Sequence, residues 1–413
     1  MRVNLNRHAR PWVVAGLTLV AAWAPGGCCL EGSEHGQDPD KCSGGGHVTT
    51  VQHAPLAVTP GALLIARYDG GDEGWDALAL ADDGAPIGEP SPTGLSSIQP
   101  RVQAWPGPAS ALVTATGADA EVYLQTPDGL RAVTRLDGAM AVAAAFDGAR
   151  YWLVDATAVA AGPLVLVAVE LDGSVHRTTV PAPFVPDDHH VGLQLAAAAP
   201  GDLVAVWRVN PQLRTDALEF RAMHYVDGQP VGAPWTVAGP VGTTCPTADH
   251  VLLATADGYH LITRRGPCDA SQPPHMIDVQ IDPAAATATE RAMPFDPARF
   301  PSWVASPRGT LAYDEQHAWM LAADGTAQLL WSAGEGDRLR AAGVTTTGFA
   351  GAVTRLEQGL PVFDLVWGAP PAPQRAFVTG DYTYTDDGCQ VGRSPTPLLA
   401  VVAWLALGRR RRR

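Results

Sequence analysis

The sequence predicts an all-β protein, and more specifically a β-propeller of seven four-stranded antiparallel blades. From about His47 onward, short apolar runs alternate with turns rich in Gly, Pro and Asp. A glycine turn followed by an apolar run recurs seven times, and a second hairpin turn follows each one. No segment sustains an apolar helical period with capping residues at its ends.

The first turn of each predicted blade places a glycine just before an apolar run. Gly148, for example, precedes the run 151–154, and Gly258 precedes the run 259–262. Such a turn joins the first and second strands of a repeat. The seven glycines are Gly61, Gly107, Gly148, Gly201, Gly258, Gly309 and Gly348.

The second turn of each blade is Asp-Gly in most repeats. Asp-Gly between apolar runs is a strong hairpin signal, because Gly accepts a positive φ and Asp tolerates the left-handed region. Two hairpin turns in a unit of roughly 45 residues describe a four-stranded sheet, and a ring of such sheets buries the faces of each. The second turns are Asp83-Gly84, Asp128-Gly129, Asp172-Gly173, Asp227-Gly228, Asp282-Pro283, Asp324-Gly325 and Gly368-Ala369.

The strands of the ring follow from these turns. In blade two we expect strands over 99–105, 109–115, 121–126 and 130–136. Residues 47–59 supply the first strand of blade one, and residues 375–385 the last strand of blade seven, which places the two ends of the ring side by side. Six or eight blades are the alternatives, because the fourth and fifth repeats carry long insertions; a pair of β-sandwiches is a further one.

The N-terminal end carries an export signal. Three arginines precede the apolar stretch 12–24, which is too short to span a bilayer as a helix. This pattern predicts a secretory signal peptide over residues 1–24. Cleavage after Ala24 is one outcome. Lipidation of Cys28, which ends a sequence similar to a lipoprotein box, is the other. Residues 25–47 form a flexible Gly-rich linker, and the propeller spans 48–385.

The C-terminal segment 386–413 contains three parts in a fixed order. Gly388-Cys389 comes first, then the apolar stretch 397–407, then five arginines at 409–413. This order resembles the C-terminal sorting tail of exported myxobacterial proteins. The resemblance implies that the tail is processed at Cys389 and that the protein is displayed on the cell surface or released. An ordinary anchor helix is the alternative, and in either case we expect export.

The exported part of the chain is strongly acidic. Removing the eight arginines at positions 2, 7, 10 and 409–413 from the 28 basic residues leaves 20 against 42 acidic ones, a net charge of about −22. Such a surface repels nucleic acid and anionic lipid. We therefore expect no nucleic-acid partner, and membrane contact through the termini only.

The six cysteines lack the paired spacing of a zinc site. Cys245 and Cys268 flank the predicted hairpin turn Asp257-Gly258, so they lie almost opposite each other and within disulfide reach. We predict that they form a disulfide. If the two cysteines of the terminal signals are modified, Cys29 and Cys42 remain to pair.

Motifs of known chemistry are missing from the sequence. We find no phosphate loop, nucleophile elbow, zinc-protease motif, EF-hand loop, aspartate box or Trp-Asp blade signature. The Asp-Asp-His-His stretch 187–190 suits a transition metal, but in an inter-blade connection an exposed loop is favoured. The acidic stretch 69–73 suits weak calcium binding, but a hairpin tip is favoured. We therefore predict no catalytic, cofactor-binding or metal-binding residues and no cofactor.

Aromatic residues in the repeats have two interpretations. Exposed Trp on a rim would suit stacking on sugars or peptides, whereas Trp in a strand packs between blades, which we favour. Residues 146–154 (Phe-Asp-Gly-Ala-Arg-Tyr-Trp-Leu-Val) and 203–207 resemble the repeat unit FDGxxYLVVW of a loosely defined bacterial surface family. That resemblance implies location and architecture more than activity.

The function expected from these features is non-enzymatic. We expect a monomeric, surface-attached propeller that serves recognition, adhesion or envelope assembly, with an extracellular or envelope protein or a glycan as its partner. The alternative is a secreted hydrolase or lyase that acts on polysaccharide or peptide at the propeller channel. A pocket with two convergent carboxylates, or with a histidine beside carboxylates, would favour the enzyme.

Overall fold

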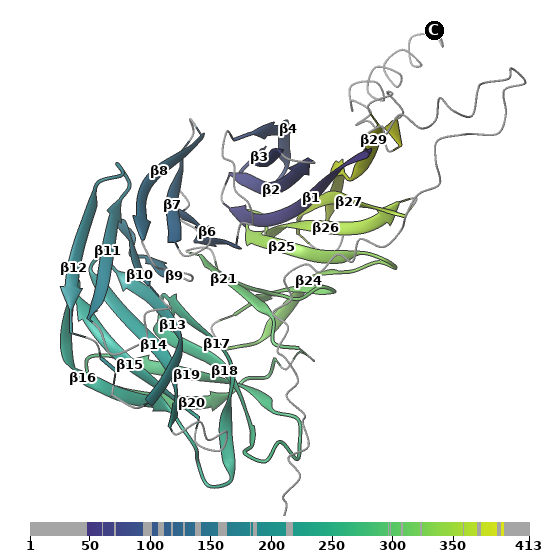
Figure 1. Ribbon diagram of the computed structural model, residues 1–413. Coiled ribbons are helices and arrows are strands. Elements are labelled where there is room, and N and C mark those ends of the chain that lie inside the picture. The colour runs from purple at the N-terminus through teal and green to yellow at the C-terminus, as the bar shows by residue number, and fades with distance from the viewer. Residues whose placement is uncertain are drawn as a thin grey trace, which may run out of the picture. The chain divides into compact units, whose positions relative to one another are not determined.

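The computed structural model describes residues 48–385 and 390–391, apart from internal gaps. These gaps are 60, 70–71, 94–100, 106–110, 117–118, 127–128, 137–141, 156–162, 182, 185–187, 212–217, 296, 298, 307–308, 323, 358 and 370–372. Contacts divide the chain into Met1–Val48 with Thr385–Cys389, and Thr49–Tyr384 with Gln390–Arg413. Regular structure in the described residues consists of β-strands (Figure 1). None of them forms a helix with the length and apolar character needed to cross a membrane.

The strands form seven sheets, which we call blades one to seven. Blade one contains β1 (Val48–Thr59), β2 (Ala62–Asp69), β3 (Asp72–Leu80) and β4 (Pro86–Pro92); blade two contains β5 (Arg101–Trp105), β6 (Ala111–Thr116), β7 (Asp119–Thr126) and β8 (Gly129–Leu136). Blade three contains β9 (Val142–Phe146), β10 (Arg150–Asp155), β11 (Leu164–Glu170) and β12 (Val175–Val180); blade four contains β13 (Asp188–Ala199), β14 (Asp202–Pro211), β15 (Glu219–Val226) and β16 (Gln229–Ala238).

The remaining three blades follow the same plan. Blade five contains β17 (Thr244–Thr255), β18 (Gly258–Pro267), β19 (His275–Asp282) and β20 (Thr287–Ala292). Blade six contains β21 (Ser302–Ser306), β22 (Gly309–Tyr313), β23 (His317–Leu321) and β24 (Ala327–Ser332). Blade seven contains β25 (Arg338–Val344), β26 (Phe349–Glu357), β27 (Leu360–Gly368) and β28 (Gln374–Gly380).

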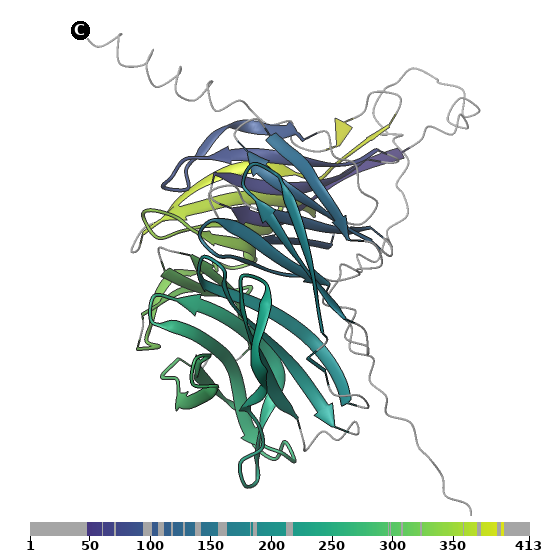
Figure 2. The same cartoon turned by 90° about the vertical axis from the view of Figure 1, so that its left-hand side faces the viewer.

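The pairing confirms the predicted propeller with seven blades. In every blade the four strands pair in sequence order, and in blade one two further strands lie outside β1. Figure 2 shows the sheets in a second view. Among the described residues, each first-turn glycine lies between the first and second strands of its blade or begins the second strand, and each second turn lies between the third and fourth strands or at their adjoining ends. The strands of blade two begin within two residues of the expected positions. Glycine turns and apolar runs were sufficient to predict the blades, because the two strands of each hairpin are close in sequence.

The last predicted strand is in fact two strands. β28 completes blade seven, but β29 (Tyr382–Thr385) leaves it and pairs beside β1, with β30 (Gln390–Val391) outside it. Asp381 stands between the two strands, and its Oδ1 accepts a hydrogen bond from the backbone N of His53 in β1 at 2.6 Å. The expected single strand over 375–385 was wrong, because the edge of β1 supplies a second pairing partner.

Alternate side chains of the second strands β10 and β14 face different neighbouring blades. In β14, Leu203 and Trp207 pack against blade three, whereas Val204 and Val206 pack against blade five, and all four are inaccessible to solvent. In β10, Trp152 contacts blade four, while the alternate residues contact blade two. This burial on both faces explains why these strands are continuously apolar and do not alternate with polar residues.

Apolar packing joins each blade to the next. Clusters join blades two and three, three and four, four and five, five and six, six and seven, and seven and one. Blades one and two meet through the rings of Trp75 and Tyr123, whose centroids are 6.5 Å apart. Packing between blades predicts that tryptophans are buried. The structure buries Trp75, Trp152, Trp207, Trp331 and Trp367.

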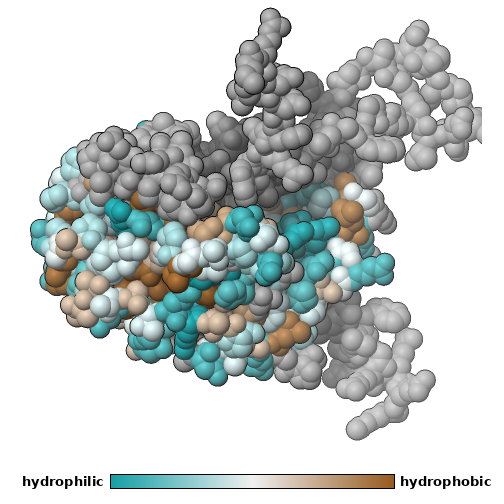
Figure 3. Space-filling view, turned by 90° about the horizontal axis from the view of Figure 1, so that it is seen from below, coloured by the Kyte–Doolittle hydropathy of each residue, from teal (hydrophilic) through white to brown (hydrophobic). Residues whose placement is uncertain are grey.

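The described residues on the face that Figure 3 presents form no extended apolar patch. Figure 3 shows hydrophobic residues in small groups between hydrophilic ones on the face it presents. Single exposed apolar residues are normal for a monomer. The large ones are Ile87, Val165, Leu171, Val226, Val231, Val241, Leu329 and Leu356.

The contact of blade one with blade seven includes a turn glycine. Gly84 has a φ of +91°, and a Cβ there would lie 2.9 Å from the Cβ of Ala350. The substitution Gly84→Ala is expected to lower the free energy of unfolding by about 2–3 kcal/mol, because backbone strain and overpacking add. Urea denaturation measures the loss. Gly61→Ala is the matched control, since its φ is +88° and nothing lies within 4 Å of the added Cβ. Equal losses in the two variants would contradict a role for blade contact.

Candidate functional site

Cys245 and Cys268 form a disulfide at the open end of the β17–β18 hairpin. Their Cα atoms are 4.9 Å apart. Cys245 lies opposite Gly266, and the backbone N of Cys268 donates to the carbonyl oxygen of Thr243 at 2.9 Å. The bond that the hairpin predicted is therefore present. The other cysteines with predicted roles lie outside the described residues, and their roles stay predictions; they are Cys28, Cys29, Cys42 and Cys389.

The two stretches that we considered as metal sites lie in hairpins. Residues 188–190 do not belong to a connection, as we had expected, but begin β13 and pair with residues 209–211 of β14. That expectation was wrong because the hairpin continues past a bulge beyond the regular length of the blade. Asp69 and Asp72 pair across the tip of β2 and β3. In the part of the chain that the structure describes, no three His, Cys, Asp or Glu side chains are grouped to hold a metal.

Asp147, in the Phe-Asp-Gly phrase of blade three, has a fully buried carboxylate. Its Oδ1 accepts hydrogen bonds from the backbone N of Ala149 and of Arg150, each at 2.8 Å. Its Oδ2 accepts from the indole Nε1 of Trp152 at 2.7 Å and from the backbone N of Gly201 at 2.9 Å. Burial alone would raise the pKa of Asp147, but these hydrogen bonds lower it below its usual value.

The best-preserved repeat unit therefore has a structural role. We call the hydrogen bond between Asp147 and Gly201 the clasp, because it joins blades three and four. Gly201 belongs to the first turn of blade four, so Asp147 ties the corresponding turns of two neighbouring blades. Its lone-pair positions are occupied by backbone and indole donors, which leaves it no role with a ligand. The sequence analysis missed this residue. Its signal was the aspartate of the repeat phrase, which we had interpreted only as a turn former.

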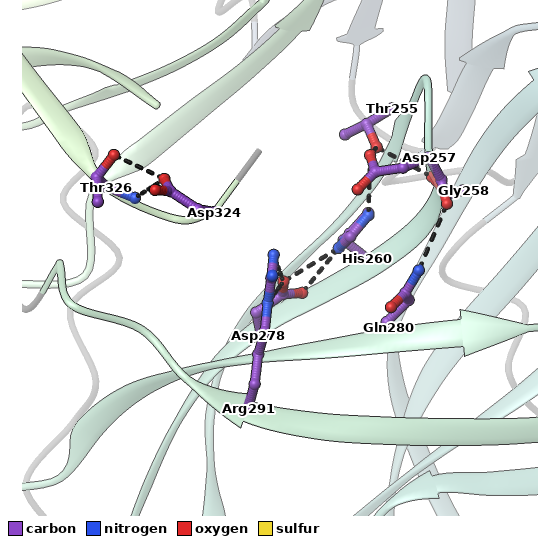
Figure 4. Close-up of polar contacts among 9 residues, drawn as sticks. All are labelled: Thr255, Asp257, Gly258, His260, Asp278, Gln280, Arg291, Asp324 and Thr326. Atoms are coloured by element: carbon purple, nitrogen blue, oxygen red, sulfur yellow. Dashed lines mark hydrogen bonds and ion pairs between the residues drawn. The ribbon is translucent and has the colours of Figure 1, made fainter. Parts of the chain in front are cut away.

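A charged network in blade five contains a buried histidine (Figure 4). His260 Nδ1 lies 2.9 Å from Asp278 Oδ1, and His260 Nε2 lies 3.5 Å from Asp257 Oδ1. Arg291 contacts Asp278 Oδ2 at 2.7 Å. Only 7 % of the His260 side chain is exposed. Figure 4 shows the turn with Asp324 in blade six on the side of Arg291.

The surroundings of His260 favour an ion pair over proton-transfer chemistry. Burial would lower the pKa of His260, but the hydrogen bond that His260 donates to Asp278 and the charges of Asp278 and Asp257 outweigh it and raise the pKa above its ordinary value. A general base at neutral pH must be unprotonated and must reach its substrate. A buried imidazole held between two carboxylates does not reach a substrate, so the network serves stability.

This network predicts a pH-dependent stability. Because the pKa of His260 is raised in the folded state, its contribution is complete below about pH 6.5, the unfolded value, and is lost as the pH rises through the folded pKa. The thermal midpoint, followed by circular dichroism from pH 6 to pH 9, is expected to fall less steeply in His260→Gln than in the wild type. His176→Gln, at an exposed position in β12, is the control. Identical slopes in wild type and His260→Gln would contradict the assignment.

A polar cavity of about 330 Å³ opens at the tip of the β22–β23 hairpin. One wall is the tip itself, and the other is the connection from blade six to blade seven, residues 333–338. The backbone N of Ala333 donates to the carbonyl oxygen of Gln316 at 2.7 Å, and the backbone N of Leu339 donates to that of Glu315 at 2.8 Å. The connection is therefore held at both ends against the hairpin tip. Backbone hydrogen bonds thus fix the two walls of the cavity.

Ion pairs surround this cavity. Glu315 binds Arg338 at 2.6 Å and Arg340 at 2.7 Å. Asp337 binds both terminal nitrogens of Arg375, at 2.7 and 3.0 Å. Burial opposes the charge of Glu315, but the two guanidinium groups lower its pKa. The hydrogen bond with Arg375 likewise lowers the pKa of Asp337. Both carboxylates are ionised at neutral pH.

Two side chains at the cavity remain available to a ligand, and a histidine ring lies beside them. Within the described residues, the amide of Gln316 and the carboxylate of Glu335 make no hydrogen bond or ion pair, and both are exposed. The ring of His317 stacks on Trp319 with centroids 5.1 Å apart and an interplanar angle of 29°. No sequence motif marked these residues, because the hairpin tip and the connection become a cavity only when blades six and seven pack.

The fold and this cavity define the class of the protein: a seven-bladed β-propeller with a polar, ion-pair-framed cavity between two blades. No protein-family model matches the chain, and no curated protein matches it. Solved structures similar to it include the β-propeller domain of the Trilobed protease from Pyrococcus furiosus, with 7 % identity, coverage of 84 % of this chain and 99 % of that chain, and a TM-score of 0.44. An oligogalacturonate lyase in complex with manganese has 11 % identity, coverage of 78 % and 91 %, and a TM-score of 0.47. The Penicillium chrysogenum α-L-arabinanase complexed with arabinobiose has 14 % identity, coverage of 68 % and 92 %, and a TM-score of 0.40. We draw no argument about activity from these similarities.

Proposed function

We propose that the chain is an exported, surface-attached propeller that recognises a ligand and does not transform it. The observation that carries this proposal is the charge pairing around the cavity between blades six and seven. Glu315 and Asp337 are each held by arginine and have lowered pKa values. Both are engaged in ion pairs, and neither is poised to give up a proton.

The alternative, a secreted hydrolase or lyase, needs a different arrangement. A glycosidase requires one carboxylic acid that stays protonated at neutral pH beside an ionised partner. Both carboxylates of the ion-paired frame have pKa values shifted in the opposite direction. His260, which does lie between carboxylates, is buried and carries a raised pKa. These observations favour recognition over catalysis.

Two features support export. The signal-like N-terminus and the tail with Cys389 are the sequence features that predict it. The Cys245–Cys268 disulfide adds a physical argument, because disulfides persist in oxidising compartments outside the cytosol. We infer that the termini alone contact the membrane, and that the propeller acts as a monomer on an extracellular or envelope protein or glycan.

The experiment for this proposal follows the full chain in a myxobacterial host. Surface proteolysis of intact cells is expected to remove the wild-type protein. A Cys389→Ser variant is expected to retain its unprocessed tail, detected as a higher mass, and a Cys28→Ser variant tests the lipid anchor at the other end. Retention of wild-type protein in the cytoplasm would contradict export. Release of products from a polysaccharide or peptide panel, followed over hours, would contradict the absence of catalysis.

A further inference from the structure

We propose that the cavity between blades six and seven binds a neutral saccharide through adjacent hydroxyl groups. This inference rests on the proposed recognition function and names its site and ligand class. Glu335, Gln316 and Arg338 are the groups that would hold the ligand. They lie on both walls of the cavity, on the hairpin tip and on the connection into blade seven.

The balance of charge selects a neutral ligand. Arg338 and Arg340 both pair with Glu315, so these three side chains together keep one uncompensated positive charge. Glu335 carries an unpaired negative charge on the same cavity, while Asp337 is bound by Arg375, which also binds Asp364. An anionic ligand would face Glu335, and a cationic ligand would face Arg338. Neither sign of net charge gains from the site as a whole.

The hydrogen-bonding groups select a polyol. Glu335 only accepts, Arg338 only donates, and the amide of Gln316 does both. Adjacent hydroxyls of a sugar donate and accept at once, so one ligand can satisfy all three groups. Hydrogen bonds to charged partners are the stronger ones, which makes Glu335 and Arg338 the main sources of affinity. A purely apolar ligand would leave Glu335 and Gln316 without partners.

The volume of the cavity and the histidine ring on its wall both suit a saccharide. A volume of about 330 Å³ is at the lower end of the range for small-molecule sites, which suits one or two sugar rings. His317 lies on the wall, and its ring is fixed by stacking on Trp319 and by Asp314, whose Oδ1 is 3.3 Å from His317 Nδ1. A fixed flat ring offers a surface to the C–H face of a pyranose.

The test measures binding of the full chain to a panel of saccharides by calorimetry. The panel contains neutral hexoses and N-acetylated hexosamines, together with uronic acids and free amino sugars. We expect binding of a neutral member. Glu335→Ala is expected to weaken that binding by about 10-fold to 100-fold, and Gln316→Ala by a smaller factor. Glu89→Ala, at an exposed carboxylate on β4, is the matched control and is expected to bind as the wild type does.

The outcomes separate this inference from the proposed function. A preference for uronic acids or free amino sugars would overturn the ligand class. Binding of a neutral sugar that Glu335→Ala leaves unchanged would overturn the site. Binding of an envelope protein with no saccharide bound would overturn this inference and leave the recognition function standing. Conversion of the sugar would overturn the recognition function itself. Thermal midpoints of all variants close to that of the wild type are required for each comparison.

Discussion

Asp147→Ala is expected to lower the free energy of unfolding by about 3–5 kcal/mol, the loss typical of breaking a buried charged pair or network. The substitution leaves the indole Nε1 of Trp152 and the backbone N of Gly201 buried without an acceptor, and each such donor costs about 1–3 kcal/mol. Chemical denaturation followed by tryptophan fluorescence measures the loss. Because the pKa of Asp147 is lowered in the folded state, its contribution persists at neutral pH and disappears only as the pH falls below about 3.8 and through the folded pKa.

Asp314→Ala is the matched control for this variant. Asp314 Oδ1 accepts from the backbone N of Gln316 and of His317, each at 2.8 Å, in a turn like that of Asp147. Its hydrogen bonds stay within blade six, so the expected loss is about 1–2 kcal/mol. A loss in Asp147→Ala no larger than in Asp314→Ala would show that the clasp to blade four contributes nothing.

Removal of the Cys245–Cys268 disulfide is expected to cost about 3 kcal/mol. The two cysteines are 23 residues apart in sequence, and a loop of that length loses about this much by the chain-entropy estimate. The double variant Cys245→Ser with Cys268→Ser is compared with the wild type in urea, each with and without dithiothreitol. Reductant is expected to lower the midpoint of the wild type toward that of the double variant.

The double variant also supplies the internal control, since its own midpoint is expected to stay constant in dithiothreitol. A wild-type midpoint that reductant leaves unchanged would contradict a stabilising disulfide. Other interactions are expected to stabilise this edge of blade five whether or not the disulfide is present. Arg265 binds both carboxylate oxygens of Glu290, at 2.7 and 2.6 Å, and donates to the carbonyl oxygen of Gly239 at 3.0 Å.

The local features of this protein could be predicted from its sequence. Gly148 and Asp172-Gly173 marked two turns of blade three, and the hairpin turn at Asp257-Gly258 placed Cys245 within reach of its disulfide partner Cys268. These predictions succeeded because each concerns residues close in the chain, where the turn type decides which residues become neighbours. The course of residues 381–385 could not be predicted, since it depends on β1, more than 300 residues away.

The candidate site shows the opposite case. Glu335 lies in a Gly-Glu-Gly turn that has no motif, and it borders a cavity only because the connection 333–338 is held around the hairpin tip of blade six. Likewise, nothing beside Asp147 in sequence reveals that Gly201, 54 residues later, supplies one of its hydrogen bonds. By itself the sequence determined the hairpins of the blades and the disulfide, because hairpins are specified by local turn chemistry, whereas it left six or eight blades as alternatives to seven. Only the tertiary structure decided which charges are paired and which face a cavity, because those contacts exist only between blades that have already packed.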